Sequence, residues 1–130
     1  MQNTTPTACL EAYFKAWQAK DWGARAALFQ RSWVRKGLTE MGDHRLDFLE
    51  RFEIHDEQWF SPVLCDVTAT VWEWSYTEVT NKKRPLKASK VRERESRWRV
   101  VCEDARGRPS TDGKWGVNPP SGIRPFDRPI

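Results

Sequence analysis

The sequence predicts an α+β fold in which two or three N-terminal helices pack on a strongly curved antiparallel sheet of about four strands. Apolar residues recur with a helical period up to about residue 52 and with a period of two after it. The helical segments all precede the strands, which favours helices laid on one face of a sheet. A chain of 130 residues suits a single core. We therefore expect one domain over 1–122 and an extended tail over 123–130.

Two helices are expected to open the chain. Thr5 and Pro6 form a start signal, because threonine caps a helix and proline suits its first turn. The apolar residues that follow share one helical face: Leu10, Tyr13, Phe14 and Trp17. Asp21 is expected to cap a second helix that ends at Gly37 and buries Trp22, Ala26, Phe29 and Trp33. A third, short helix is expected to start at Asp43 and to carry Leu46, Leu49 and Phe52 inward.

Strands are expected from about Phe52 onward. The segments are "FEIHDEQWF", residues 63–79, "LKASKVRERESRWRVVCED" and the short "GKWGV", with a hairpin loop at 81–85. In the second strand the odd positions are small and apolar, so they should face the helices. The even positions then form a row on the outer face that suits a dimer interface: Trp72, Trp74 and Tyr76.

The third strand divides differently. Its even positions end in Trp98, Val100 and Cys102, so we place that set inside and the odd set outside. This places Arg92 and Arg94 near the open end of the sheet, where they reach solvent, pair with Glu73 or Asp56, or bind an anionic ligand. His55 is expected on the outer face.

The last strand is expected to end at a specific motif, "WGVN" followed by two prolines. Trp115 should be in the core, and Gly116 should leave room for a close neighbour. Asn118 can satisfy a loose backbone group or line a pocket. Pro119 and Pro120 cannot donate to a ladder, so pairing should stop there.

Charge and cysteine content exclude several classes. The net charge of +4 is too small to indicate a nucleic-acid binder by itself, although residues 82–108 hold eleven basic and four acidic residues and so attract anions. Cysteines 9, 65 and 102 match no zinc spacing or disulfide framework, and we expect Cys65 and Cys102 to be buried and inert. No metal and no cofactor is predicted.

Neither a leader nor a membrane span is apparent, so we expect a cytoplasmic protein, although a leader already removed would leave no trace.

The paired opening "AYFKAWQAKDWGARAALFQRSW", three long strands and a short last one together resemble the nuclear transport factor 2-like superfamily, also called the cystatin-like cone. The tail, "VVCED" and then "DGKWGVNPPS", is similar to that of a bacterial branch without assigned chemistry. The resemblance implies a cone in which helices close a bent sheet around a pocket, and a homodimer formed through the outer face of the sheet.

The resemblance also allows a comparison with enzymes of that superfamily. Ketosteroid isomerases use a tyrosine on the first helix, and Tyr13 is similarly placed. Their general base follows the second helix, where this chain has "SWVRK" and no carboxylate before Glu40. Epoxide hydrolases need an Asp-Arg-Asp arrangement, which the inward positions do not supply. We therefore expect no catalytic residues.

Three functions remain open. The first is a non-catalytic module that binds a small, partly apolar and anionic molecule, with these pocket candidates: Tyr13, Trp17, Asp56, Glu73, Arg92, Arg94, Trp98 and Asn118. The second is a protein-interaction module that uses the outer aromatic face, for which nucleic acid is a less favoured partner. The third is an isomerase or hydrolase that acts through Tyr13 and Glu73.

Overall fold

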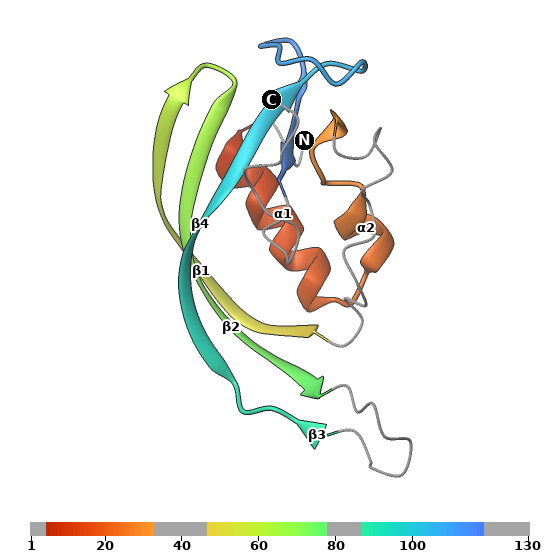
Figure 1. Cartoon of the computed structure of the whole chain (residues 1–130), viewed down its shortest axis with the longest axis vertical. Coiled ribbons are helices and arrows are strands. Elements are labelled where there is room, and N and C mark those ends of the chain that lie inside the picture. Colours follow the sequence, from red (N-terminus) through yellow and green to blue (C-terminus); the bar gives the residue numbers. More distant parts are fainter. Residues whose placement is uncertain (1–4, 33–46, 78–86, 119–130) are drawn as a thin grey trace.

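The fold is α+β, with an N-terminal helix packed on an antiparallel sheet (Figure 1). The computed structural model describes residues 5–32, 47–77 and 87–118. Four strands follow the order β1-β2-β4-β5, and the short β3 pairs with the end of β2. The elements are α1 (Pro6–Gln18), α2 (Trp22–Ala26), β1 (Asp47–Ser61), β2 (Leu64–Thr77), β3 (Lys87–Ala88), β4 (Arg92–Glu103) and β5 (Lys114–Val117).

The first helix forms as the sequence predicts. The Thr5 side chain accepts a hydrogen bond from the Ala8 N–H at 3.0 Å, and Pro6 occupies the first turn. The predicted apolar face is buried against the sheet and consists of Leu10, Tyr13, Phe14 and Trp17. Local signals and tertiary packing agree here, which is why the prediction holds.

The second helix is much shorter than predicted. Asp21 caps it, accepting from the Ala24 N–H at 3.1 Å, but the helix ends at Ala26. Phe29 instead forms a parallel bridge with Val117, and the Gln30 N–H donates to the Val117 carbonyl at 2.8 Å. Pairing with β5 therefore replaces helical hydrogen bonds in a segment whose apolar spacing is helical. The rest of the predicted helix, with Trp33 and Gly37, lies outside the described residues.

The predicted third helix is wrong over its described part, because β1 begins at Asp47. Leu49 and Phe52 pair with Glu73 and Val71, and the register shifts between Leu49 and Arg51. A bulge inserts one extra residue, so two residues three apart point to the same face of the sheet. That spacing reads as helical in the sequence, and the bulge explains the error. The segment from Asp43 to Leu46 lies outside the described residues.

The faces of β2 are as predicted, and those of β4 only in part. All four central odd residues of β2 are fully buried toward α1: Cys65, Val67, Ala69 and Val71. On β4, Trp98, Val100 and Cys102 are buried as expected. The expectation that the odd residues face solvent is wrong for Val101 and Glu103, which are also buried. Gln30 and Ser32 cover Glu103, as their hydrogen bonds to its carboxylate show.

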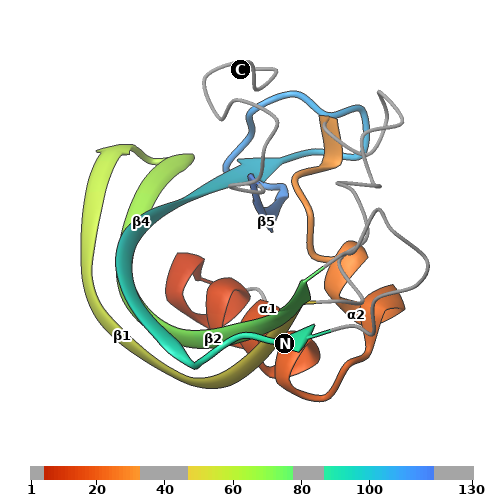
Figure 2. The same ribbon diagram turned by 60° about the horizontal axis from the view of Figure 1, so that its bottom comes forward.

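The sheet arches around α1 (Figures 1 and 2). It is not strongly curled, so the predicted strong curvature is wrong. In Figure 1, α1 lies between the sheet and α2, and α2 packs mainly on α1. The sheet therefore has to cover one helix of 13 residues instead of two long ones. A cluster of aromatic rings fills the space between α1 and the sheet: Tyr13, Phe14, Phe29, Phe52 and Trp98.

The described residues bear on the membrane prediction and leave the domain boundary untested. Among the described residues, no helix combines the length and apolar character that crossing a membrane requires. The predicted hairpin loop at 81–85 and the tail over 123–130 lie outside the described residues. The boundary at residue 122 stays a prediction.

Candidate functional site

The guanidinium group of Arg25 is the most unusual group on the inner side of the protein. Its residue is only 7% exposed, and its Cζ lies over three aromatic rings: 5.1 Å from the ring centroid of Tyr13, 4.6 Å from that of Trp17 and 5.7 Å from that of Trp22. Such cation–π contacts hold a guanidinium in place and offset part of its desolvation. No carboxylate among the described residues forms an ion pair with it.

The turn between the helices places Arg25 there. After α1, Lys20 adopts a left-handed φ of 60° and the Asp21 N–H donates to the Ala16 carbonyl at 2.9 Å. This closes the chain tightly, and the Asp21 cap starts α2 directly beside the last turn of α1. Arg25, one turn into α2, then meets Tyr13 and Trp17. Sequence analysis singled out both rings but not the arginine, because arginine side chains are mostly exposed to solvent.

The guanidinium is only partly satisfied. Its Nε and Nη1 are buried and have no hydrogen-bond partner. Burial raises the pKa of Tyr13 above 10.0; the positive charge of Arg25 and a hydrogen bond with it lower that pKa, and the charge of Glu73 raises it. The phenol is therefore protonated at neutral pH. Tyr13, Arg25 and Glu73 belong to one electrostatic environment.

Glu73 and Arg94 form the ion pair that the sequence suggested. The Arg94 Nη2 lies 3.2 Å from a Glu73 carboxylate oxygen, and the side chains are 44% and 18% exposed, respectively. Arg92 pairs in register with Glu73 but is exposed. The expected inward place of Asp56 is wrong. It is exposed and pairs with Thr68 on the outer face, because a second register shift between Ile54 and Asp56 reverses its side.

Two further donors on the inner face of β4 have no partner. Trp98 is 2% exposed, and its indole Nε1 is buried without an acceptor. The Ser96 Oγ, two residues earlier on the same face, is also buried and unpaired. Trp98 was a predicted pocket residue, whereas Ser96 was not. The Trp98 ring lies 5.9 Å from that of Tyr13, which links these donors to the Arg25 environment.

A second buried polar cluster surrounds Glu103, and sequence analysis did not find it. The Glu103 carboxylate is fully buried and accepts from the Ser32 N–H (2.9 Å), the Ser32 hydroxyl (2.7 Å) and the Gln30 amide (3.0 Å). Asn118 joins by donating to the Gln30 Oε1 at 3.0 Å. Asn118 is therefore buried, as a pocket candidate should be, but it lies with Glu103 and not with Arg25. Its Oδ1 has no partner.

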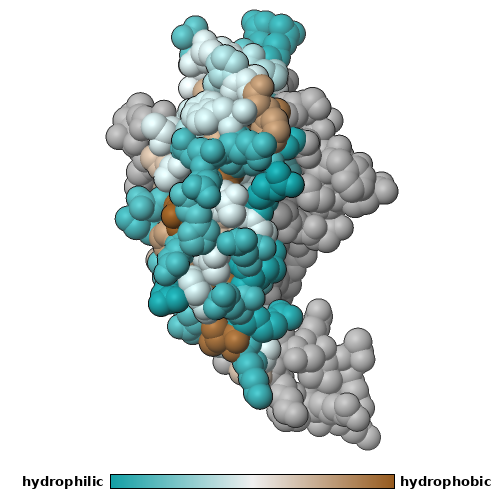
Figure 3. Space-filling view, turned by 90° about the vertical axis from the view of Figure 1, so that its left-hand side faces the viewer, coloured by the Kyte–Doolittle hydropathy of each residue, from teal (hydrophilic) through white to brown (hydrophobic). Residues whose placement is uncertain are grey.

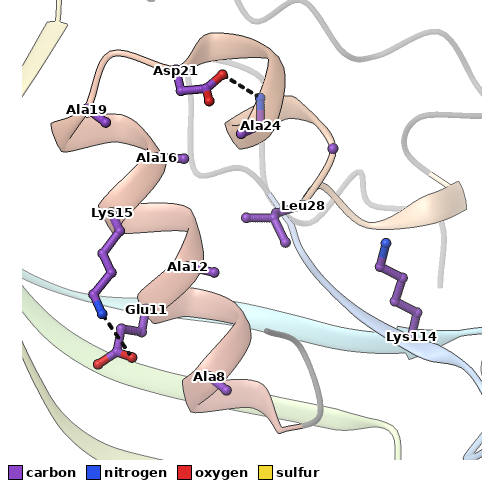
Figure 4. A pocket seen from close by; sticks show the side chains of 11 residues that line it. Ala8, Glu11, Ala12, Lys15, Ala16, Ala19, Asp21, Ala24, Leu28 and Lys114 are labelled. Carbon is purple, nitrogen blue, oxygen red and sulfur yellow. Dashed lines mark hydrogen bonds and ion pairs between the residues drawn. The ribbon is translucent and has the colours of Figure 1, made fainter. Parts of the chain in front are cut away.

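An open groove of about 610 Å³ lies along the side of α1 that faces away from the sheet (Figure 4). Alanines of α1, of α2 and of their C-caps form much of its lining, with Leu28 facing α1 and Lys114 at one end. Lys15, on its rim, is paired with Glu11 at 3.6 Å. The groove is large enough for a small ligand, but few of its lining side chains are polar.

The outer face of the sheet carries the predicted aromatic row in part. Trp72 stacks under Arg51, whose Cζ is 3.8 Å from the ring, and donates to Glu93 at 3.0 Å. Trp74 stacks on Phe48 with a centroid separation of 4.4 Å. Figure 3 shows this face as a mosaic of hydrophilic and near-neutral residues with small, separate hydrophobic areas. The side chain of Tyr76 lies outside the described residues, and the dimer stays a prediction.

His55, Cys65 and Cys102 are placed as predicted, and Cys9 is buried as well. His55 lies on the outer face, where its Nε2 contacts the Thr70 hydroxyl at 2.7 Å. All three cysteines are free and buried. Burial raises the pKa of Cys9 to about 12 and that of Cys65 to about 11, so both are protonated thiols at neutral pH. No group of three metal-ligating side chains occurs among the described residues.

Comparison of the chain with protein-family models, with curated proteins and with solved structures finds no match.

Proposed function

We propose that this protein binds a small, partly apolar, anionic molecule beside Tyr13 of α1, which contacts both Arg25 of α2 and Trp98 of β4, and that it does so without catalysis. The observation that carries the proposal is Arg25, a guanidinium that is 7% exposed, surrounded by aromatic rings and left with two unpaired nitrogens. A buried charge without a counterion costs stability. A bound anion would offset that cost, and the surrounding rings would contact its apolar part.

The neighbouring groups favour binding over catalysis. Glu73, the inward carboxylate nearest to this environment, is held in an ion pair with Arg94. A carboxylate that acts as a general base has to be free and within reach of a substrate proton. Tyr13 and Arg25 are both donors at neutral pH. The group thus offers hydrogen bonds and positive charge to a ligand but no free proton acceptor.

The resemblance to the cone superfamily is part of the same proposal. An N-terminal helix on one face of an antiparallel sheet, with a second helix packed on the first and a short last strand beside the first, agrees with that arrangement. The inner face is where members of such a superfamily would hold a ligand. The modest bend of this sheet favours a small ligand.

The test compares the thermal unfolding of the native protein, Arg25→Met and Arg97→Met with apolar carboxylates such as benzoate, phenylacetate and octanoate, and with the matching neutral amides. Arg97 is exposed on the outer face and serves as the control. At ten times the dissociation constant a ligand adds about 1.4 kcal/mol, which is about 5 °C in a domain of this size. We expect this shift for one or more carboxylates and no amide, in the native and Arg97→Met proteins only.

The Arg25→Met variant also tests the alternative that Arg25 is a structural clamp. Methionine fills similar volume and removes an uncompensated charge, so the ligand-free variant should be as stable as the native protein or about 1 kcal/mol more stable. A variant destabilised by several kcal/mol, together with no stabilisation of the native protein by any carboxylate, would refute the proposal and assign Arg25 to fold stability.

A further inference from the structure

Three side chains of the inner face carry buried hydrogen-bond donors without an acceptor: Arg25 at Nε and Nη1, Ser96 at Oγ and Trp98 at Nε1. Native proteins leave few buried donors unpaired. Among the described residues, the other unpaired buried side-chain atom is the Asn118 Oδ1, an acceptor in the separate cluster around Glu103. The inner face therefore combines unpaired groups of one kind, all of them able to donate.

These donors form two groups: Arg25 is the first place, and Ser96 with Trp98 is the second. Aromatic side chains lie between the two places. The Tyr13 ring is 5.1 Å from the Arg25 Cζ and 5.9 Å from the Trp98 ring centroid, so both residues contact the same ring. Phe14 meets the Trp98 ring edge-on at 5.1 Å. A molecule that satisfied both places would have to lie along aromatic carbon between them. It would therefore carry its two polar ends on an apolar body.

The charges distinguish the two ends. Arg25 is the positive group of the first place, and Glu73, which lies close enough to influence Tyr13, is already neutralised by Arg94. A singly charged anion neutralises this one uncompensated positive charge, whereas a phosphate dianion would leave a net negative charge buried without a partner, which is costly. The second place offers an indole N–H and a hydroxyl, which are neutral and call for a neutral oxygen acceptor.

We infer that the ligand is a monocarboxylate whose apolar ring carries a second, uncharged oxygen: the carboxylate pairs with Arg25, and the second oxygen accepts from the Trp98 Nε1–H, with Ser96 beside it. This inference rests on the proposed function and deepens it by naming the ligand class. A carbonyl oxygen fits best, because it accepts hydrogen bonds and adds no donor to a site that already has several.

The experiment uses three probes: para-acetylbenzoate, its near-isostere para-isopropylbenzoate, and para-acetylphenyl phosphate. Dissociation constants are measured by titration of the native protein, with the indole N–H resonances followed by NMR. The acetyl acid should bind about fivefold to tenfold more tightly than the isopropyl acid, because the second probe leaves the indole donor unpaired. The Trp98 indole resonance should shift with the acetyl acid and much less with the isopropyl acid. The phosphate should bind more weakly than either acid.

Variants separate the two polar places. Trp98→Phe should remove the preference for the acetyl acid, while Ser96→Ala should reduce it less and Arg25→Met should weaken both acids together. If Trp98→Phe fails to fold, the Trp98 resonance in the native protein still decides the question. Equal affinity for the two acids, without a Trp98 shift, would overturn this inference and leave the proposed function standing. Tighter binding of the phosphate would overturn the monocarboxylate class. Failure of every carboxylate to bind would remove the proposed function itself.

Discussion

The Glu103 carboxylate and Ser32, which are 71 positions apart, form two hydrogen bonds: the Ser32 N–H donates to one oxygen at 2.9 Å, and the Ser32 hydroxyl donates to the other at 2.7 Å. Glu103 is fully buried, and its partners are neutral. The pair joins the end of β4 to the segment after α2. It therefore fixes the position of Ser32 against the outer side of this part of the sheet.

Replacing Glu103 with Gln should destabilise the protein by about 2 kcal/mol. The amide keeps the shape of the carboxylate, but its NH₂ group faces donors from Ser32 and Gln30, so at least one buried donor loses its acceptor. Urea unfolding measures the change. Glu93→Gln is the control, because Glu93 is exposed, and it should change stability by less than about 0.5 kcal/mol. Equal effects of the two substitutions would show that the cluster around Glu103 adds no stability.

Gly116→Ala should cost about 1–3 kcal/mol, because the added methyl group has no room. A Cβ at this position would lie 2.7 Å from the Gln30 Cα and 2.8 Å from the Phe29 carbonyl oxygen, and both are backbone atoms that cannot rotate away. Gly23→Ala is the matched control. Its Cβ would have its nearest neighbour at 3.9 Å, inside a helix, so it should stabilise by up to about 1 kcal/mol. Chemical unfolding should therefore give changes in the free energy of unfolding that have opposite signs for the two variants. A Gly116→Ala variant as stable as the native protein would contradict the close approach of Gln30 to β5.

The elements that could be predicted from the sequence are those whose local signals agree with their packing. Thr5, Pro6 and the apolar face of α1 all predict the same helix, and the alternation in β2 predicts its buried face. The errors arise where tertiary contacts override a local period. Phe29 keeps helical spacing yet pairs with Val117, and a bulge brings Leu49 and Phe52 to one face. Neither the strand that pairs with Phe29 nor the bulge after Leu49 can be recognised from the local spacing of apolar residues.

The candidate site was predictable only for its apolar residues and one ion pair. Tyr13, Trp17 and Trp98 follow from periodicity, and Glu73 with Arg94 follows from neighbouring strands. Arg25 does not, because its burial depends on the tight turn at Lys20 and on three rings from two helices. Glu103 does not either, because alternation places it outside, and only the covering segment with Ser32 buries it. Buried charges of this kind depend on long-range contacts that a single sequence does not display.

Stability should fall as the pH rises above about 9, because the folded state keeps its thiols protonated. The pKa of Cys9 is raised from 9.0 to about 12, chiefly by burial. In the unfolded state this thiol ionises near pH 9, so the unfolded state binds fewer protons and the free energy of unfolding decreases with pH up to the folded pKa. Each such thiol contributes a slope of up to about 1.4 kcal/mol per pH unit. Below pH 9 its contribution is fully present.

Urea titrations between about pH 7.5 and 10, a range set by these pKa values, measure this loss. Cys9→Ala should make the dependence shallower, while Cys65 and Cys102, whose pKa values are also raised, keep part of it. In the native protein at pH 8 all three thiols should resist iodoacetamide, and they should react after unfolding. Rapid alkylation of a native thiol, or stability unchanged up to pH 10, would contradict the burial of these side chains.

The predicted homodimer can be tested through the outer face. If two copies pair there, sedimentation equilibrium should report about twice the chain mass of 15.3 kDa. A double variant, Trp72→Ser with Trp74→Ser, should then dissociate, because it removes the two largest rings from the centre of the interface. Phe60→Ser is the control: Phe60 is 50% exposed near the β1–β2 turn, and its loss should leave the dimer intact.

A monomeric protein also has structural support, since Arg51 and Glu93 already contact Trp72, and Phe48 stacks on Trp74. A monomeric native protein would mean that these contacts within the chain, and not a second copy, account for the aromatic row.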